Sequence, residues 1–265
     1  MLIEHEVLRF DQLKGKFESL RDSIVIEEIT RLHINGSLYA VFHHLPSQVK
    51  ELVVGYLLTE GLIERVEDVL EMKFSGRDVH VRLSEDKYFN APDKTQLITT
   101  FCSGKITSPS IFKAAQKLRF NNIRFSVKTI FESVEILNSR ASIFRASGGT
   151  HSAALINEDC EIIAFAEDIG RHNAIDKVIG EAAIKGAGFS ELLLASTGRL
   201  TSEVVIKVVQ IGIPVLVSLS APTSMGLRIA EAFGLTLIGF ARGKRLNIYT
   251  SQHRIEEWAQ LNIKQ

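Results

Sequence analysis

The chain has 265 residues, 45% of them hydrophobic and 23% charged, which is enough apolar material for one large domain or two modest ones. Its 31 basic residues balance 31 acidic ones, so the net charge gives no reason to expect binding to nucleic acid or to an acidic membrane surface. The apolar runs stop far short of a membrane span and the start does not resemble a signal peptide, so we expect a cytoplasmic protein.

The first part of the chain is predicted to be rich in strands. Asn35-Gly36 supplies the positive φ angles of a tight turn and predicts a hairpin over residues 22–43. Apolar residues at helical spacing follow, and Gly61 is placed to end that helix. A second hairpin is expected around residues 75–78.

Residues 84–110 lose this periodicity and have the composition of a long loop. Cys102 lies inside it, near the cation of Lys105, a setting that favours the thiolate and makes a nucleophile plausible. An incidental cysteine is an equal alternative, because one lysine shifts the pKa of a thiol only modestly. Two helices are predicted next, beginning at Ser108 and covering residues 130–137.

The other cysteine, Cys160, follows a predicted hairpin turn at residues 157–159 and is expected to be a small buried or strand-face residue. Two cysteines are too few for a disulfide framework, and neither belongs to a CxxC pair. We therefore expect no metal site.

Beyond about residue 150, short apolar runs alternate with helices that begin at Arg171, Ser202 and Ser224. This alternation predicts a sheet that is covered by helices. We place the change of architecture between an N-terminal region, residues 1–146, and an α/β domain, residues 147–265.

In open α/β sheets, ligands bind beyond the carboxyl ends of the strands, where loops lead into helices. Arg171, His172 and Asn173 lie in one such loop, and the last strand leads into residues 240–245 with three cations. A solvated charged turn is the alternative for those cations. His172 and Asp176 are one helical turn apart and could form an acid/base pair, although polar residues at a helix start more often cap it.

Four stretches resemble, in the same order, the FdhD family of formate dehydrogenase accessory sulfurtransferases: GYLLTEGLI at 55–63, SGGTHSAAL at 147–155, EDIGRHNAIDKVIG at 167–180 and the segment 212–250. The resemblance covers nearly the whole chain from about residue 20. It implies an α/β protein whose C-terminal part is a three-layer, cytidine-deaminase-like domain without the metal, preceded by a smaller mixed β/α region.

The resemblance also implies a function. Such a protein accepts sulfur from a cysteine desulfurase as a persulfide, here on Cys102, and passes it to the molybdenum of a bis(molybdopterin guanine dinucleotide) cofactor bound for formate dehydrogenase. Residues that match the family's cofactor-binding stretch are Phe240, Ala241, Arg242, Gly243, Lys244 and Arg245.

One departure keeps alternatives open. Well-known members have two cysteines in a CxxC loop, whereas this chain has Cys102 alone in TTFCSGKI. A non-enzymatic cofactor carrier or chaperone for formate dehydrogenase is therefore the second hypothesis, and a small-nucleotide hydrolase that uses His172 and Asp176 is the third. The oligomeric state stays open, with a homodimer among the possibilities.

Overall fold

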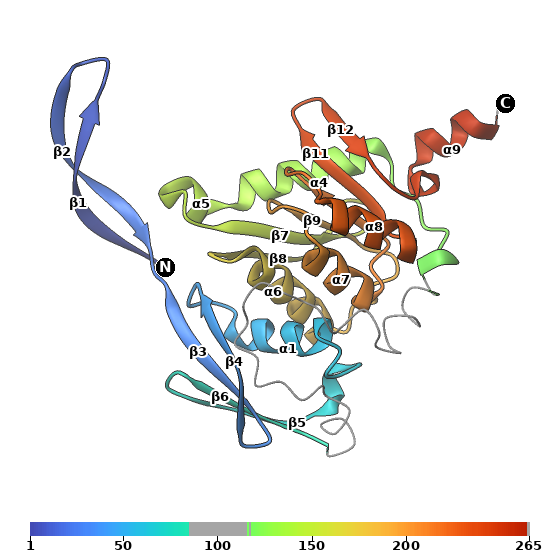
Figure 1. Ribbon diagram of the computed structural model, residues 1–265, viewed down its shortest axis with the longest axis horizontal. Coiled ribbons are helices and arrows are strands. Elements are labelled where there is room, and N and C mark those ends of the chain that lie inside the picture. The colour runs from blue at the N-terminus through green and yellow to red at the C-terminus, as the bar shows by residue number, and fades with distance from the viewer. Residues whose placement is uncertain (85–115, 117, 264–265) are drawn as a thin grey trace.

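The computed structural model describes residues 1–84, 116 and 118–263, and these residues form three separate β-sheets. The first is a hairpin of β1 (Leu2–Asp11) and β2 (Lys16–Val25), which extends away from the rest of the molecule as an arm (Figure 1). The expected loop and cysteine at residues 84–110, and the helix expected from Ser108, lie almost entirely outside the described residues.

The arm was not predicted from the sequence. Its turn is held by Asp11, whose Oδ1 accepts hydrogen bonds from the backbone N–H groups of Leu13 (2.9 Å) and Lys14 (3.1 Å). Gly15 then takes a positive φ of 62°. Residues 22–25, which were assigned to the following hairpin, belong to β2, so the predicted boundary was wrong there. Because this arm has only two strands, its apolar side chains are poorly covered, and Leu13 is 99% exposed.

The second sheet has the strand order β4-β3-β6-β5 and confirms both predicted hairpins. Asn35 and Gly36 have positive φ angles of 48° and 87° in the first turn, and Gly76 has 59° in the second. The predicted helix between the hairpins is α1, and Gly61 follows it with a φ of 70°. The elements of this part are β3 (Glu28–Ile34), β4 (Ser37–His44), α1 (Val49–Thr59), the 3-10 helix η1 (Val66–Asp68), β5 (Val69–Ser75) and β6 (Asp78–Leu83).

The third sheet has six strands in the order β12-β11-β10-β9-β7-β8. Strands β9, β10 and β11 are parallel, and every residue of β9 and β10 is buried, as expected for strands that are covered on both faces. The strands are β7 (His151–Ile156), β8 (Ile162–Asp168), β9 (Leu193–Ser196), β10 (Val215–Ser218), β11 (Thr236–Arg242) and β12 (Arg245–Ile248).

Helices cover both faces of the six-stranded sheet and confirm the predicted layers. One apolar core joins α6, α7 and α8 to the sheet, and a second joins α4 to the opposite face. Helix α4 precedes the expected boundary at residue 146, yet it packs on this sheet. The expected likeness of the C-terminal part to a cytidine deaminase stays a prediction. The helices are α4 (Val127–Arg140), α5 (Ser142–Ser147), α6 (Arg171–Ile184), α7 (Ser202–Ile211), α8 (Ser224–Phe233), the 3-10 helix η2 (Gln252–Arg254) and α9 (Glu256–Ile263).

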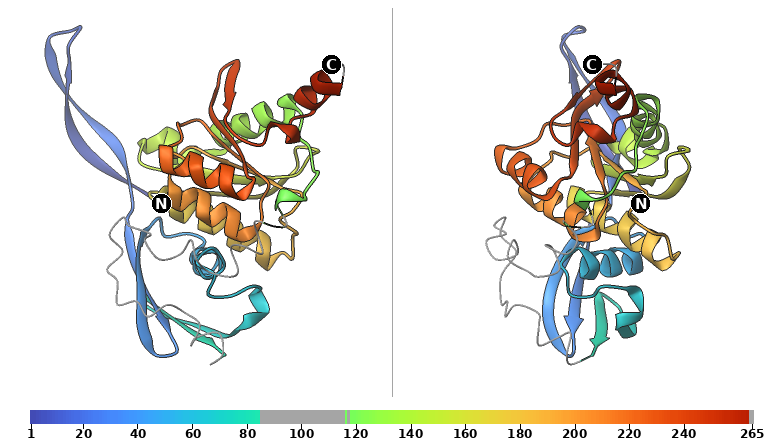
Figure 2. Two further views of the ribbon diagram at one scale, coloured as in Figure 1. Left: turned by 45° about the vertical axis from the view of Figure 1, so that its right-hand side comes forward. Right: turned by 90° about the vertical axis from the view of Figure 1, so that its right-hand side faces the viewer.

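Helix α1 lies between the four-stranded sheet and α6, as both views of Figure 2 show. Two glycines let the helices touch backbone to backbone. A Cβ atom on Gly55 would lie 1.7 Å from the carbonyl oxygen of Asp176, and one on Gly180 would lie 1.9 Å from that of Glu51. The N-terminal sheet is thereby held against the α/β layers through α1.

Arg254, near the C-terminal end of the described residues, joins two segments that lie far apart in the sequence. Its side chain is fully buried, and its guanidinium donates hydrogen bonds to the carbonyl oxygens of Gly234 (2.8 Å) and Leu118. The next residue, Ile255, pairs with Phe125 in an isolated β-bridge. Within the described residues, no helix combines the length and the apolar character that a membrane crossing requires.

Candidate functional site at the carboxyl edge of the six-stranded sheet

The loops that follow β8, β9 and β10 lead into α6, α7 and α8 at one edge of the six-stranded sheet. Hydrogen bonds connect these loops to one another. The hydroxyl of Ser220 donates to the carbonyl oxygen of Thr197 (2.9 Å), and the backbone N–H of Phe240 donates to the carbonyl oxygen of Ser220 (3.1 Å). Because three helix N-termini meet here, backbone N–H groups and helix dipoles favour an anion at this edge.

Two arginines add positive charge at the same edge. Arg171 begins α6 and its side chain lies over Gly198, where a Cβ atom would approach it to 2.8 Å. Burial lowers the pKa of Arg171, and the neighbouring charge of Arg199 lowers it further. The Nε of Arg171 is shielded from solvent without a hydrogen-bond partner among the described residues. Two guanidinium groups whose charges act on each other, one with an unused donor, are well suited to an anionic ligand.

The His172 ring lies beside Glu203. Its Nε2 lies 3.2 Å from Oε2 of Glu203, without the geometry of a hydrogen bond. Burial lowers the pKa of His172 to about 3, with Lys207 and Arg171 acting in the same direction, so the ring is neutral near pH 7. The contact with Glu203 is therefore not an ion pair.

Asp176, the other member of the possible acid/base pair, is held by a different set of residues. Its carboxylate oxygens each lie 2.9 Å from Nζ of Lys207, and its Oδ1 accepts a hydrogen bond from the hydroxyl of Thr59 (2.8 Å). Asp176 and Lys207 are both buried, at the junction of α1, α6 and α7. This cluster joins three helices, which accounts for Asp176 by a structural role.

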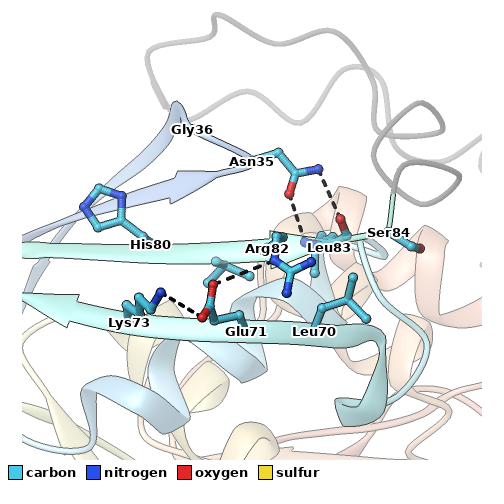
Figure 3. A pocket seen from close by; sticks show the side chains of 10 residues that line it. Asn35, Gly36, Leu70, Glu71, Lys73, His80, Arg82, Leu83 and Ser84 are labelled. Carbon is cyan, nitrogen blue, oxygen red and sulfur yellow. Dashed lines mark hydrogen bonds and ion pairs between the residues drawn. The ribbon is translucent and has the colours of Figure 1, made fainter.

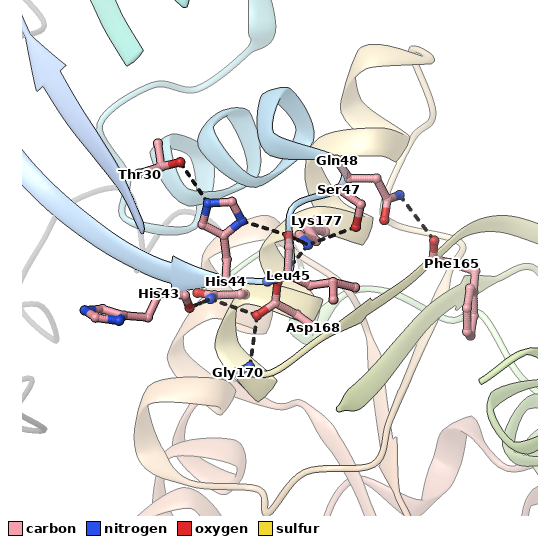
Figure 4. A network of polar contacts seen from close by, with 11 residues as sticks. Thr30, His43, His44, Leu45, Ser47, Gln48, Phe165, Asp168, Gly170 and Lys177 are labelled. Atoms are coloured by element: carbon pink, nitrogen blue, oxygen red, sulfur yellow. Dashed lines mark hydrogen bonds and ion pairs between the residues drawn. The ribbon is translucent and has the colours of Figure 1, made fainter. Parts of the chain in front are cut away.

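A buried ion pair lies at the start of α6 and connects it to the N-terminal part (Figure 4). Nζ of Lys177 is 2.7 Å from Oδ2 of Asp168, and neither side chain is exposed. The same oxygen accepts a hydrogen bond from the backbone N–H of Leu45 (3.1 Å), and Nζ of Lys177 donates to the carbonyl oxygen of Leu45 (3.1 Å). These contacts fix the segment between β4 and α1 against α6.

Asn173 takes part in the same junction. Its Nδ2 donates to the carbonyl oxygen of His43 (2.8 Å) and to Oδ1 of Asp168 (3.0 Å). Of the three residues predicted in this loop, Arg171 therefore lies at the edge with an unused donor, whereas Asn173 joins the two parts of the chain.

The predicted stretch 240–245 forms a hairpin between β11 and β12 and does not lead into a helix. Phe240 has a φ of 51° at an irregularity in the strand pairing, and the guanidinium carbon of Arg242 lies 5.8 Å from the centre of its ring. Ala241 is fully buried, so its side chain cannot contact a ligand. Gly243, Lys244 and Arg245 are exposed at the end of the hairpin.

A cavity of about 420 Å³ lies next to the arginine pair. The SGGTH stretch, residues 147–151, borders it and had no role predicted from the sequence. Its walls are mostly apolar, with polar groups from Asn138 and from the residues around His151. A cavity between a strand start and two helices could not be inferred from strand and helix patterns. The lining residues are Leu137, Asn138, Ala141, Phe144, Gly148, Gly149, Thr150, His151, Ser152, Ile169, Thr197 and Leu219.

A more open cavity of about 570 Å³ lies on the four-stranded sheet, near Ser84 (Figure 3). Its one carboxylate contacts both of its cations: Oε1 of Glu71 lies 2.8 Å from Nζ of Lys73, and Oε2 lies 3.7 Å from Nε of Arg82. Because both cations already have an anionic partner, it is a weaker candidate for an anionic ligand than the sheet edge. No cluster of three or more potential metal ligands occurs in the part of the chain that the structure describes.

Of the two cysteines, only Cys160 lies within the described residues. It is half-buried in the turn before β8 with a φ of 65°, so the prediction of a strand position was wrong by two residues. Burial raises the pKa of its thiol, and Glu132 raises it further. Both effects make Cys160 a poor nucleophile near neutral pH.

Comparison with known proteins identifies the family. The model of the FdhD/NarQ family matches residues 25–256. The chain is 35% identical to the sulfur carrier protein FdhD of Wolinella succinogenes, over 89% of this chain and 83% of that protein. It is also 35% identical to the sulfur carrier protein FdhD of Sulfolobus acidocaldarius, over 91% of this chain and 94% of that protein.

The fold has a counterpart among solved structures. A crystal structure from Desulfotalea psychrophila, of a candidate formate dehydrogenase accessory protein, superimposes with a TM-score of 0.76 at 22% identity, covering 96% of this chain and 99% of that one. The match of the family model over most of the length and the two relatives at 35% identity lead to one conclusion: the chain belongs to the FdhD/NarQ family.

Proposed function

We propose that this chain is a sulfur carrier that serves the maturation of formate dehydrogenase. Relatives that it matches over most of their length are named sulfur carrier proteins, and the solved structure of similar fold is described as a candidate formate dehydrogenase accessory protein. The structural observation that carries the proposal is the arginine pair, Arg171 with its unpartnered Nε and Arg199, at the edge where three helices begin. It provides a place for an anionic cargo, the molybdenum bis(molybdopterin guanine dinucleotide) cofactor.

Cys102 is the proposed sulfur-carrying thiol. Its thiolate attacks the terminal sulfur of a persulfide on a cysteine desulfurase, the donor's S–S bond breaks, and the donor leaves as a thiolate. A thiol from another molecule then attacks the inner sulfur of the Cys102 persulfide and forms a disulfide with Cys102. The outer sulfur leaves as sulfide, which is available to the molybdenum. The cytoplasm, where thiols are kept reduced, is the compartment that suits this exchange.

Mass spectrometry after incubation with a cysteine desulfurase and cysteine tests the loading step. We expect one added sulfur atom on the wild-type protein and on Cys160→Ser, and none on Cys102→Ser, because the Cys160 thiol is half-buried with a raised pKa. Loading of Cys102→Ser, with loss of loading in Cys160→Ser, would reverse the assignment. If neither cysteine takes up sulfur while the protein still binds nucleotide, the chain is a non-enzymatic cofactor carrier.

The proposed cargo site is tested with guanosine diphosphate as a fragment of the cofactor. Arg171 and Arg199 would each make a charge-assisted contact with a phosphate, so Arg171→Gln/Arg199→Gln should weaken binding by at least about a hundredfold. Arg228→Gln is the matched control, because Arg228 is exposed on α8 and lies outside the proposed site. Unchanged binding to the double variant in calorimetry would refute the site.

The hairpin arginines extend the proposed site. Arg242 lies beside the Phe240 ring, and Phe240 is hydrogen-bonded to the loop after β10. The variant Arg242→Ala/Arg245→Ala should weaken nucleotide binding by about 2 to 4 kcal/mol if each arginine makes one such contact, while persulfide loading persists. Loss of loading in parallel, without unfolding, would contradict this division of roles.

A further inference from the structure

The buried carboxylate of Asp168 holds the loop after β8 from two sides. Its Oδ1 accepts hydrogen bonds from the backbone N–H of Gly170 (2.9 Å) and from Nδ2 of Asn173 (3.0 Å). Its Oδ2 accepts one from the backbone N–H of Leu45 (3.1 Å) and lies 2.7 Å from Nζ of Lys177 (Figure 4). Each oxygen serves two partners and the side chain is 0% exposed, so Asp168 itself cannot touch a ligand.

The two contacts of Oδ1 lie on either side of Arg171 in the sequence. Gly170 directly precedes Arg171, and Asn173 follows it in the first turn of α6. The packing here is tight, because a Cβ atom on Gly170 would lie 3.2 Å from Nδ2 of Asn173 and 3.6 Å from Oδ1 of Asp168. One buried carboxylate therefore fixes the backbone from which the Arg171 side chain departs.

The Arg171 side chain depends on this backbone for its place. Its aliphatic part packs on Gly198, where a Cβ atom would lie 2.8 Å from it, and its Nε has no hydrogen-bond partner among the described residues. A guanidinium binds a phosphate through short, nearly linear hydrogen bonds of about 2.7 to 2.9 Å. A small displacement of the backbone at Arg171 would therefore weaken its contact with an anion.

We infer that Asp168 is a positioning residue of the cargo site, and that it sets the place of the Arg171 guanidinium by holding the backbone around it. The inference rests on the proposed function, because Arg171 is one of the two arginines of that site. Lys177 has a part in the same role, since its ammonium is the counter-charge that lets the Asp168 carboxylate stay buried and ionised.

Calorimetric titration with guanosine diphosphate tests the inference in two double variants. Asp168→Ala/Lys177→Met removes the carboxylate together with its counter-charge, so no buried charge is left unpaired, and it should weaken binding by at least about tenfold. Asp168→Asn/Lys177→Met also removes both charges but keeps an oxygen acceptor for Gly170 and Asn173. Its affinity should stay within about threefold of the wild-type value, a rescue that a role in stability alone does not predict.

The other buried ion pair of α6 provides the matched control. Asp176 and Lys207 lie 2.9 Å apart and hold α6 against its neighbouring helices. Asp176→Asn/Lys207→Met makes the same change of charge without altering the contacts of Asp168, and nucleotide affinity should stay within about twofold of the wild-type value. A loss as large as that in Asp168→Ala/Lys177→Met would overturn the inference, because any loosening of α6 would then suffice.

A double-mutant cycle with Arg171 shows whether Asp168 acts through that residue. In the background of Arg171→Gln, adding Asp168→Ala/Lys177→Met should weaken the remaining binding by less than about twofold, because the side chain that Asp168 positions is already gone. Losses that add in full would overturn the inference. Wild-type affinity in Asp168→Ala/Lys177→Met would overturn it as well.

Gly170→Ala keeps the test decisive if Asp168→Ala/Lys177→Met does not fold. It leaves the ion pair intact, but its Cβ would press on Nδ2 of Asn173, so binding should weaken by at least about threefold while Arg171 is present. Wild-type affinity in Gly170→Ala would then overturn the inference. If Arg171→Gln itself binds nucleotide like the wild-type protein, both the cargo site and the inference are refuted. If Arg171→Gln weakens binding and the Asp168 and Gly170 variants do not, only the inference fails.

Discussion

Replacing Lys177 by methionine should strongly destabilise the protein. The Lys177 ammonium lies 2.7 Å from Oδ2 of Asp168, and both side chains are 0% exposed. Without it, the Asp168 carboxylate stays buried with three neutral donors, the N–H groups of Leu45 and Gly170 and the amide of Asn173. Leaving a buried charge without its partner costs about 3 to 5 kcal/mol, a large share of the roughly 5 to 15 kcal/mol that stabilises a typical protein.

Urea unfolding followed by circular dichroism measures this cost, provided that the slope m is unchanged. Helix α6 offers a matched control in Lys185, whose Nζ is 2.6 Å from Glu181 but whose side chain is 55% exposed. Lys185→Met should cost less than about 1 kcal/mol because water screens the exposed pair. Adding Asp168→Asn to Lys177→Met should recover stability. Equal losses in the two single variants would refute the reasoning.

Two further predictions concern α6. Gly180→Ala should lower the free energy of unfolding by about 3 kcal/mol or more, because its Cβ would lie 1.9 Å from the carbonyl oxygen of Glu51. Gly188→Ala is the control and should be nearly neutral in the same unfolding assay, because a Cβ there would meet no atom within 4 Å. Similar losses in the two variants would contradict the close helix contact. His172 has a folded pKa of about 3 against a usual 6.5, so unfolding takes up a proton between these values and stability falls as the pH falls through that window. His172→Gln should flatten this fall in acid titrations of the free energy of unfolding, while the exposed His5→Gln should not; an unchanged slope in His172→Gln would refute it.

Local sequence signals were sufficient for most elements of the fold. The Asn35-Gly36 turn, the glycine after α1 and the alternation beyond residue 150 each have a short-range physical cause, and the structure confirms them. The arm was not predicted because its strands bury little apolar surface. The sequence of residues 2–25 therefore lacks the alternation of apolar and polar residues that marks a strand with one buried face. Its signal was the turn at Asp11 and Gly15, which was not used.

The candidate site was less predictable, because its partners come from distant segments. The carboxyl edge and Arg171 followed from the βα alternation, but the sequence could not show that Asp176 bonds to Lys207 and Thr59, or that Asn173 reaches His43. The strand before residues 240–245 was expected to be the last one, and β12 was missed because this short strand has little periodicity.

The buried Arg254 has a consequence for the order in which the molecule can assemble during synthesis. The carbonyl groups that it holds belong to Gly234 and to Leu118, which leaves the ribosome 136 residues earlier. The arm and the two N-terminal hairpins pair within short stretches and can form as soon as they emerge, because N-terminal parts generally fold first. The α/β layers, in contrast, stay open at this corner until residue 254 has been made. A nascent chain stalled before that point would expose the Leu118 carbonyl and the partly covered core around Phe125, and would be a natural substrate for a chaperone.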